Sequence, residues 1–143
     1  MILLDTSGLL SALFPDQPRH EESARTLLDL PVPAILSPFV LAELDYMIGS
    51  LAGVEAELRF LEDVSREAYR LVGFSAADVA EAHAIIARYR DQDIGLADAS
   101  LILLSQRLET LDVLTLDERH FRVVRGWKGR PFRILPADGP ARG

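Results

Sequence analysis

The chain has 143 residues, 49% of them hydrophobic, which suffices for one domain with a sizeable core. It has no cysteine, so disulfide frameworks, thiolate zinc sites and cysteine nucleophiles are excluded. The net charge of −7, taken alone, argues against nucleic acid as a partner, although the local distribution of charge decides more than the sum.

No segment predicts a targeting signal or a membrane span. The chain meets a charge at Asp5 without a basic leader before it. The longest uncharged runs contain prolines and are too short to cross a bilayer. We therefore expect a soluble, cytoplasmic protein that does not bind a membrane.

The first part of the chain alternates short apolar runs with helical patterns. The expected elements are a strand at 3–4, a helix over 9–14 ended by Pro15, a helix over 20–30, a strand over 34–36 and a helix from Pro38 to about Leu51. The second helix would place Ala24, Leu27 and Leu28 on one face. Glu43 would lie within the third.

The alternation continues to the end of the chain. The expected elements are a helix over 54–68 with Leu58 and Leu61 inward, a strand over 69–74, a helix opened by Ser75 with Val79, Ala82, Ile86 and Tyr89 on one stripe, a loop over 91–95, a helix over 96–108 and a strand at 113–114. The apolar segments 123–124 and 132–135 would add one or two short strands. This order predicts an α/β fold with a largely parallel sheet covered on both faces. We expect one domain over 1–136 and a loose C-terminal tail over 137–143.

Four acidic residues stand out by their positions in these elements. Asp5 and Asp117 each follow a predicted strand, Asp98 lies in a first helical turn, and Glu43 lies among apolar residues. Taken singly, each has an ordinary explanation as a cap, a dipole partner or a solvent-facing acid. Four carboxylates at one point would instead require a cation, and Mg²⁺ or Mn²⁺ prefers such oxygen ligands. If the four meet, the expected chemistry is phosphodiester hydrolysis by a metal-activated water.

Four segments together resemble one protein family. They are ILLDTSGLL at 2–10, LAEL at 41–44, GLADA at 95–99 and LTLDERHF at 114–121. In this order they resemble the PIN-domain nucleases, and specifically the VapC-type toxins of bacterial toxin–antitoxin pairs. The resemblance spans nearly the whole chain.

The resemblance implies a three-layer α/β/α sandwich around a short central parallel sheet. It implies that Asp5, Glu43, Asp98 and Asp117 bind Mg²⁺ or Mn²⁺ and are the catalytic residues of an endoribonuclease. Supporting polar roles then fall to Thr6, Ser7 and Thr115. The implied partners are an RNA substrate, a cognate VapB-like antitoxin and a second copy of the chain in a homodimer assembled with the antitoxin.

Further residues have weaker claims. The segment from Arg119 to Arg133 has no acid, and we expect Arg119, Arg122, Arg125 and Arg130 to position RNA near Asp117. The apolar faces with Leu27, Leu28, Leu58, Phe60 and Leu61 are core or an antitoxin groove. His120 could serve as a metal ligand or base, but a carboxylate site does not need it. Asp93 is a candidate fifth acid or a turn residue, and Asp45 should point away from Glu43.

Three other functions remain as alternatives. A phosphotransfer protein would place a lysine against the phosphate, but the single lysine, Lys128, is far from the strand-end motifs. A non-catalytic PIN-like binding module would have lost its acids. A PIN nuclease of RNA processing, outside any toxin pair, is separated from the toxin by the presence of a neighbouring antitoxin gene. Phosphate-binding and dinucleotide-binding glycine motifs do not occur.

Overall fold

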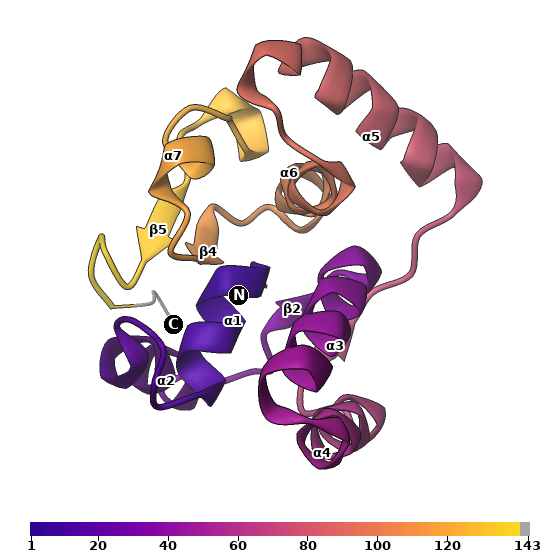
Figure 1. The fold of residues 1–143 in the computed structure, drawn as a ribbon. Helices are drawn as coiled ribbons and strands as arrows, with labels where there is room; N and C mark the ends of the chain where they lie inside the picture. The colour runs from indigo at the N-terminus through magenta and orange to yellow at the C-terminus, as the bar shows by residue number, and fades with distance from the viewer. Residues whose placement is uncertain (141–143) are drawn as a thin grey trace.

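The computed structural model describes residues 1–140, which fold into a parallel sheet with helices on both sides (Figure 1). The strands are β1 (Leu3–Leu4), β2 (Ile35–Leu36), β3 (Arg70–Leu71), β4 (Asp112–Leu114) and β5 (Arg133–Leu135). The helices are α1 (Thr6–Leu13), α2 (His20–Leu28), α3 (Pro38–Ala52), α4 (Val54–Ser65), α5 (Ala76–Arg88), α6 (Leu96–Leu108) and α7 (Glu118–Phe121), with short 3₁₀ turns η1 (Arg90–Gln92) and η2 (Trp127–Gly129).

The sheet has the order β3-β2-β1-β4-β5 and every neighbouring pair is parallel. Its central strand β1 pairs Leu3 with Ile35 on one side and with Val113 on the other. Leu3 and Leu4 are fully buried, as expected of a parallel strand covered on both faces. The chain order reverses between β2 and β4 around β1, which opens a crevice at the carboxyl ends of β1 and β4.

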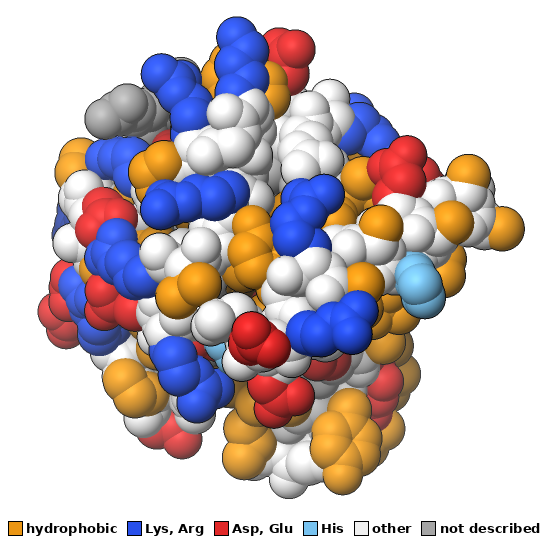
Figure 2. Space-filling model, turned by 90° about the horizontal axis from the view of Figure 1, so that it is seen from above, with side chains coloured by type: hydrophobic (Ala, Val, Ile, Leu, Met, Phe, Trp, Pro, Cys, Tyr) orange, Lys and Arg blue, Asp and Glu red, His pale blue; other side chains and the backbone are white. Residues whose placement is uncertain are grey.

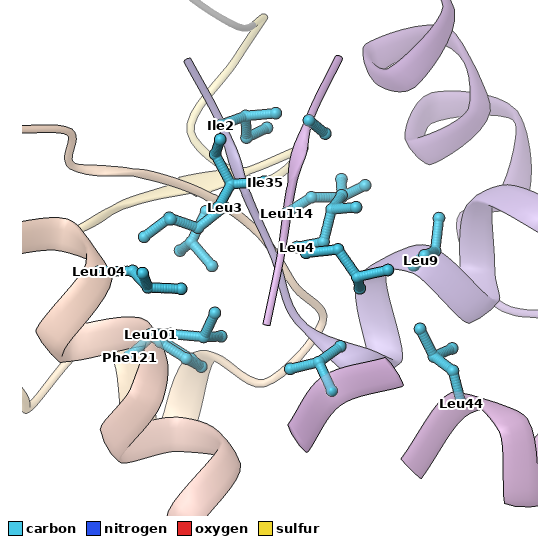
Figure 3. Close-up of a cluster of buried hydrophobic side chains, with 14 of the residues drawn as sticks. Ile2, Leu3, Leu4, Leu9, Ile35, Leu44, Leu101, Leu104, Leu114 and Phe121 are labelled. Carbon is cyan, nitrogen blue, oxygen red and sulfur yellow. The ribbon is translucent and has the colours of Figure 1, made fainter. Parts of the chain in front are cut away.

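The helices bury the sheet from two sides, which confirms the expected α/β sandwich. In Figure 1, α1 and α2 lie on one side of the sheet and α5 and α6 on the other, while α3 and α4 pack as a pair beside them. The core closes on Leu9, Leu44, Leu101 and Phe121, all of which are buried against the strands (Figure 3).

Two helix starts match their sequence signals. At α3 the Ser37 hydroxyl accepts from the Phe39 amide at 3.2 Å, and Pro38 occupies the first helical turn. At α5 Ser75 and Asp78 form a reciprocal capping box. These caps fix where each helix begins, and the cap of α3 sets the position of Glu43 in its second turn.

The inward face predicted for α4 was wrong, and the face predicted for α2 is half-buried at Ala24 and Leu27 but not at Leu28. Leu28 is 83% exposed and Leu58 54% exposed, and Leu61 also lies at the surface. In α4 the buried stripe runs through Phe60 and Val64, which are one helical turn apart, so the two leucines flank it.

In α2 the face turned toward α1 is polar and small. Ser23 and Thr26 are buried there, and the Ser11 hydroxyl of α1 donates to the Ser23 hydroxyl at 2.9 Å. Hydrogen-bonded hydroxyls of this kind can be buried in a helix packing without loss of a polar partner.

The end of the chain supplies one short strand, within the expected one or two. The segment 123–124 forms a turn after α7, and only the later apolar segment forms a strand, β5. Within the proposed loose tail, Asp138 accepts hydrogen bonds from Arg122 and from the Ile134 amide at 2.8 Å. The domain boundary at 136 stays a prediction, and residues 141–143 of that tail lie outside the described residues. Among residues 1–140, no helix is both long and apolar enough to cross a membrane.

Candidate active site

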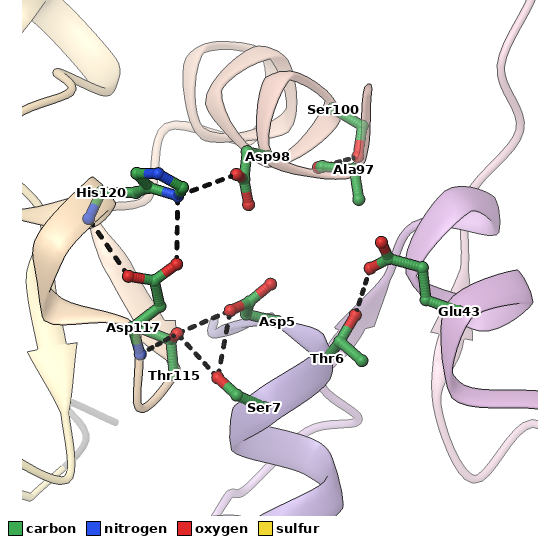
Figure 4. Close-up of polar contacts among 10 residues, drawn as sticks. All are labelled: Asp5, Thr6, Ser7, Glu43, Ala97, Asp98, Ser100, Thr115, Asp117 and His120. Carbon is green, nitrogen blue, oxygen red and sulfur yellow. Dashed lines mark hydrogen bonds and ion pairs between the residues drawn. The ribbon is translucent and has the colours of Figure 1, made fainter. Parts of the chain in front are cut away.

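The structure places the four acids around one cavity of about 460 Å³. Asp5 directly follows β1, Asp117 precedes α7 after β4, Asp98 lies in the first turn of α6, and Glu43 reaches in from α3 (Figure 4). These elements meet at the carboxyl ends of β1 and β4, where the strand order reverses. The further lining residues are Thr6, Ser7, Leu10, Gln17, Pro18, Met47, Leu116 and His120.

A larger hollow of about 870 Å³ lies elsewhere, between the end of α4 and the edge strand β3. Its lining is mainly apolar, with Val32, Leu61 and Tyr69 among its residues, and none of the four acids contributes to it. The smaller cavity is therefore the site where polar groups converge, which is the mark of a chemical site.

Asp5 is held by one hydroxyl from the end of β4 and by one from the first turn of α1. Its Oδ2 accepts a hydrogen bond from Thr115 Oγ1 at 2.6 Å and a longer one from Ser7 Oγ at 3.3 Å. Asp5 occupies the N-cap position of α1, but its side chain accepts no capping hydrogen bond there. Thr115 also accepts from the Asp117 amide at 2.9 Å, which couples the two acids through one hydroxyl.

Glu43 is positioned by Thr6 across the cavity. Thr6 Oγ1 donates to Glu43 Oε1 at 2.6 Å, which joins the start of α1 to α3. A buried contact of 2.7 Å between the Ser37 and Ser100 hydroxyls joins the start of α3 to α6. The supporting hydroxyls expected at Thr6, Ser7 and Thr115 thus all lie within hydrogen-bonding distance of an acid.

Asp117 and His120 form a compact turn at the opposite side of the cavity. Asp117 Oδ1 accepts from the His120 amide at 3.2 Å and so caps α7. The imidazole Nδ1 of His120 lies 3.1 Å from Asp117 Oδ2 and 3.3 Å from Asp98 Oδ2 (Figure 4). Sequence reasoning had set His120 aside, and the available signal was its spacing of three residues from an acid that caps a helix.

Burial and crowding of like charges perturb the acids. Burial raises the pKa of Asp5 from 3.8 to about 6; the hydrogen bond from Thr115 opposes this shift and the charges of Asp98 and Asp117 add to it. Burial likewise raises the pKa of Asp98, with His120 opposing the shift and the charges of Asp117 and Glu43 adding to it. The cavity thus concentrates negative charge that His120 offsets only in part.

The donor set fits a hard divalent cation in chemical kind. All four groups are carboxylates, the ligands that Mg²⁺ and Mn²⁺ prefer, and two of them carry raised pKa values that a cation would relieve. As they stand, no three Asp, Glu, His or Cys side chains in the described part of the chain are arranged to hold a metal ion by themselves. Mg²⁺ binds through one or two carboxylates and keeps several waters, so the wide spacing still fits that ion.

Other predicted residues lie away from the cavity. Asp93 is exposed, does not line the cavity and has a positive φ of 54°, as a turn residue does. Asp45 lies beside Glu57 of α4, whose pKa it raises. The guanidinium of Arg122 forms ion pairs with Glu118 and Asp138, both at 2.8 Å.

Comparison with known proteins agrees with the fold and the motif positions. The family model of the PIN domain matches residues 2–126. Ribonuclease VapC26 of Mycobacterium tuberculosis is 36% identical over 135 residues, which cover 94% of this chain and 100% of that protein.

Two solved structures share the fold. The crystal structure of Mycobacterium tuberculosis VapC20, described as a sarcin-ricin loop cleaving toxin, superposes with a TM-score of 0.75 at 18% identity and covers 82% of this chain and 90% of that one. FitAcB from Neisseria gonorrhoeae superposes with a TM-score of 0.63 at 24% identity and covers 85% of this chain and 91% of that one. From the match to the family model and the relative at 36% identity, the chain belongs to the PIN domain family.

Proposed function

We propose that this protein is a Mg²⁺- or Mn²⁺-dependent endoribonuclease that acts as the toxin of a toxin–antitoxin pair. The observation that carries the proposal is the cavity lined by Asp5, Glu43, Asp98 and Asp117, four acids from four separate elements. The similarity of the chain to Ribonuclease VapC26, over 94% of its length, supports RNA as the substrate. The cytoplasm, where such a substrate is abundant, is the proposed location.

In this proposal the cation binds in the cavity that the four acids line, through one or two carboxylates, and the hydroxyls orient the acids. Thr115 and Ser7 orient Asp5, and Thr6 orients Glu43. When bound, the cation supplies an activated water and neutralises charge that develops on the attacked phosphate. The fixed carboxylates keep this chemistry at the carboxyl ends of the central strands, open to a bound RNA strand.

The first test is cleavage of total cellular RNA by the purified protein. We expect discrete fragments with Mg²⁺ or Mn²⁺, none with a chelator, and none from the Asp98→Asn variant. Asp16→Asn changes an exposed acid between α1 and α2 and should cleave like the unchanged protein. If the folded protein neither cleaves RNA nor binds either metal, the nuclease proposal fails and a binding module replaces it.

The proposed path of the RNA follows exposed arginines beside the cavity. Arg119, Arg125 and Arg130 are exposed and form no ion pair among residues 1–140, unlike Arg122. The Arg125 amide donates to the Tyr89 hydroxyl at 3.1 Å. This bond brings Arg88, at the end of α5, and Arg90, at the start of η1, near the segment that contains Arg125. Figure 2, seen from above Figure 1, shows several Lys and Arg side chains on one face of the molecule, with Asp and Glu side chains among them.

Salt dependence of RNA binding tests this path. In an Asp98→Asn background, changing Arg119, Arg125 and Arg130 to Gln should weaken binding and lower the slope of log affinity against log salt by about 2, since each contact contributes about 0.7 for single strands. The control is Arg59→Gln, an exposed arginine of α4 without an ion pair among the described residues. An unchanged slope would mean that these arginines do not contact the RNA phosphates.

The toxin role predicts growth arrest and its relief by a partner. Expression should arrest growth, Asp98→Asn should not, and co-expression of a VapB-like antitoxin encoded next to this chain should restore growth. We propose that the toxin assembles with its antitoxin as a homodimer, and the exposed Leu28, Leu58 and Leu61 are the candidate antitoxin contacts. Cleavage without growth arrest would favour an RNA-processing nuclease outside any toxin pair.

A further inference from the structure

His120 occupies an unusual place in the acid cavity. Its side chain is 13% exposed, and Nδ1 lies between the Oδ2 atoms of Asp117 and Asp98, at 3.1 and 3.3 Å. Figure 4 shows the ring joining these two acids, while Glu43 stands on the far side of the cavity. Among the residues labelled in Figure 4, His120 is the one whose side chain brings a nitrogen to the acids.

The position of Nδ1 is that of a bridge between two carboxylates. Although it is buried, Nδ1 forms no well-directed hydrogen bond within the described residues. A ring that served only to orient Asp117 would point its N–H squarely at one oxygen. Sharing Nδ1 between two like-charged groups instead places partial positive charge where their mutual repulsion is greatest.

The local backbone holds the bridge in place. Asp117 uses Oδ1 to accept from the His120 amide and presents Oδ2 to the ring of the same residue. Phe121, the next residue, is 1% exposed and packs edge-on against Phe132, which anchors the turn in the core. The turn from Asp117 to Phe121 thus sets the position of the imidazole beside the acids.

We propose that His120 is a positioning residue that bridges Asp98 and Asp117 in the metal-free protein and gives up this bridge when a divalent cation binds. This inference rests on the proposed function, because it assumes that these acids take up the metal. A divalent cation between the acids supplies more positive charge than a shared N–H, so the ring and the cation compete for the same oxygens. Removal of the ring should therefore tighten metal binding, whereas loss of a merely structural residue would weaken it.

The test is the affinity for Mn²⁺, measured by titration calorimetry and by the electron paramagnetic resonance signal of the free ion. We expect His120→Ala to bind Mn²⁺ tighter, on the order of tenfold. His120→Asn, whose amide nitrogen can stand near the position of Nδ1, should bind close to the unchanged protein. The control is His83→Ala, an exposed histidine of α5 that does not line the cavity. Unchanged or weaker binding by His120→Ala would overturn the proposal.

A second measurement needs no substitution of His120. In protein labelled with ¹⁵N histidine, Mg²⁺ should shift the ring signals of His120 and leave those of His83 in place. Signals of His120 that do not move while Mg²⁺ binds would overturn the proposal even if the alanine variant fails to fold.

Failure of the inference is distinguishable from failure of the proposed function. Metal binding that is lost in Asp98→Asn, together with unchanged affinity in His120→Ala, overturns the bridge and leaves the nuclease standing. Absence of Mn²⁺ binding to the unchanged protein overturns both.

Discussion

At the scale of single residues, Asp5 shows a conflict between folding and chemistry. Asp5 is 6% exposed and its carboxylate accepts from the Thr115 hydroxyl, yet burial raises its pKa to about 6. Ionised Asp5 therefore costs folding free energy in the metal-free protein. A residue kept at such a cost is expected to act on a ligand, since an amide or an apolar group would serve the fold better.

The pH dependence of stability tests this cost. Because the folded pKa is raised from 3.8 to about 6, the contribution of Asp5 is fully favourable below about pH 4 and is lost as the pH rises through 6. We expect Asp5→Asn to be more stable than the unchanged protein at about pH 7.5 in chelator, by about 1–3 kcal/mol, and to lose this advantage near pH 4. Denaturant titrations across this range measure it, with Asp16→Asn as the control. A variant no more stable at the higher pH would contradict the argument.

At Gly8 the room available for a side chain, rather than charge, determines which residue the fold accepts. A Cβ built there would lie 2.1 Å from the Leu114 carbonyl oxygen and 2.7 Å from the Thr115 amide nitrogen, so α1 would have to move off the end of β4. We expect Gly8→Ala to lower the free energy of unfolding by about 2–4 kcal/mol and to disturb the Thr115 contact with Asp5.

Thermal and denaturant unfolding measure this loss against Gly73→Ala. A Cβ at Gly73 would meet nothing within 4 Å, and its φ is not in the left-handed range, so this variant should unfold like the unchanged protein. Equal stability of the two variants would mean that α1 is not held against β4 as tightly as the structure shows.

At the scale of elements, sequence predicted the existence of helices and strands better than their faces. The apolar runs before Asp5 and Asp117 were short and clear, so both strand ends were placed correctly. The buried face of α4 was placed wrongly, because Leu58 and Leu61 predict one apolar face and Phe60 and Val64 predict another. Only the packing against the neighbouring helix decides which of the two faces is buried.

The candidate site shows the same limit. Each acid could be placed on an element from the sequence, but Asp5 and Thr115 are 110 positions apart and their contact depends on the pairing of β1 with β4. His120 was set aside because a histidine has no fixed role in a carboxylate site. Its reach to Asp98 depends on the packing of α7 against α6, which local pattern does not encode.

The end of β5 is fastened to α7 by a charged pair. Asp138 accepts from both terminal nitrogens of Arg122 at 2.8 Å and from the Ile134 amide. The hydrogen bonds from Arg122 lower the pKa of Asp138 from 3.8 to about 2, against the effect of burial, and the Ile134 amide adds to the lowering. The stability that this pair contributes is therefore present above about pH 4 and is lost as the pH falls toward 2.

Asp138→Asn should thus destabilise the protein at neutral pH, by about 1 kcal/mol because both side chains are partly exposed to screening solvent. The difference from the unchanged protein should shrink as the pH falls below 4, as followed by denaturant titration. Arg66→Gln, which removes the more exposed pair between Arg66 and Glu62 in α4, should cost little at either pH. A deficit of Asp138→Asn that persists unchanged at low pH would exclude the charged pair as its cause.

At the scale of the whole molecule, the charge is unevenly distributed. The chain carries −7 in total, yet four of its acids line one cavity, and Figure 2 shows several Lys and Arg side chains on one face of the molecule. The acids lie directly after β1, in α3, in α6 and in the turn before α7, so they join segments from both halves of the chain. A cation held by them would therefore stabilise the fold as a whole and not one element.

Thermal unfolding with and without Mg²⁺ tests this coupling. A ligand at one hundred times its dissociation constant adds about 2.7 kcal/mol to the free energy of unfolding. For a domain of this size, each kcal/mol raises Tm by about 3 °C, so saturating Mg²⁺ should raise Tm by about 8 °C. Asp98→Asn should lose this rise and Asp16→Asn should keep it. If Mg²⁺ raised Tm equally in all three proteins, the ion would be acting on the general surface charge and not through the acid cavity.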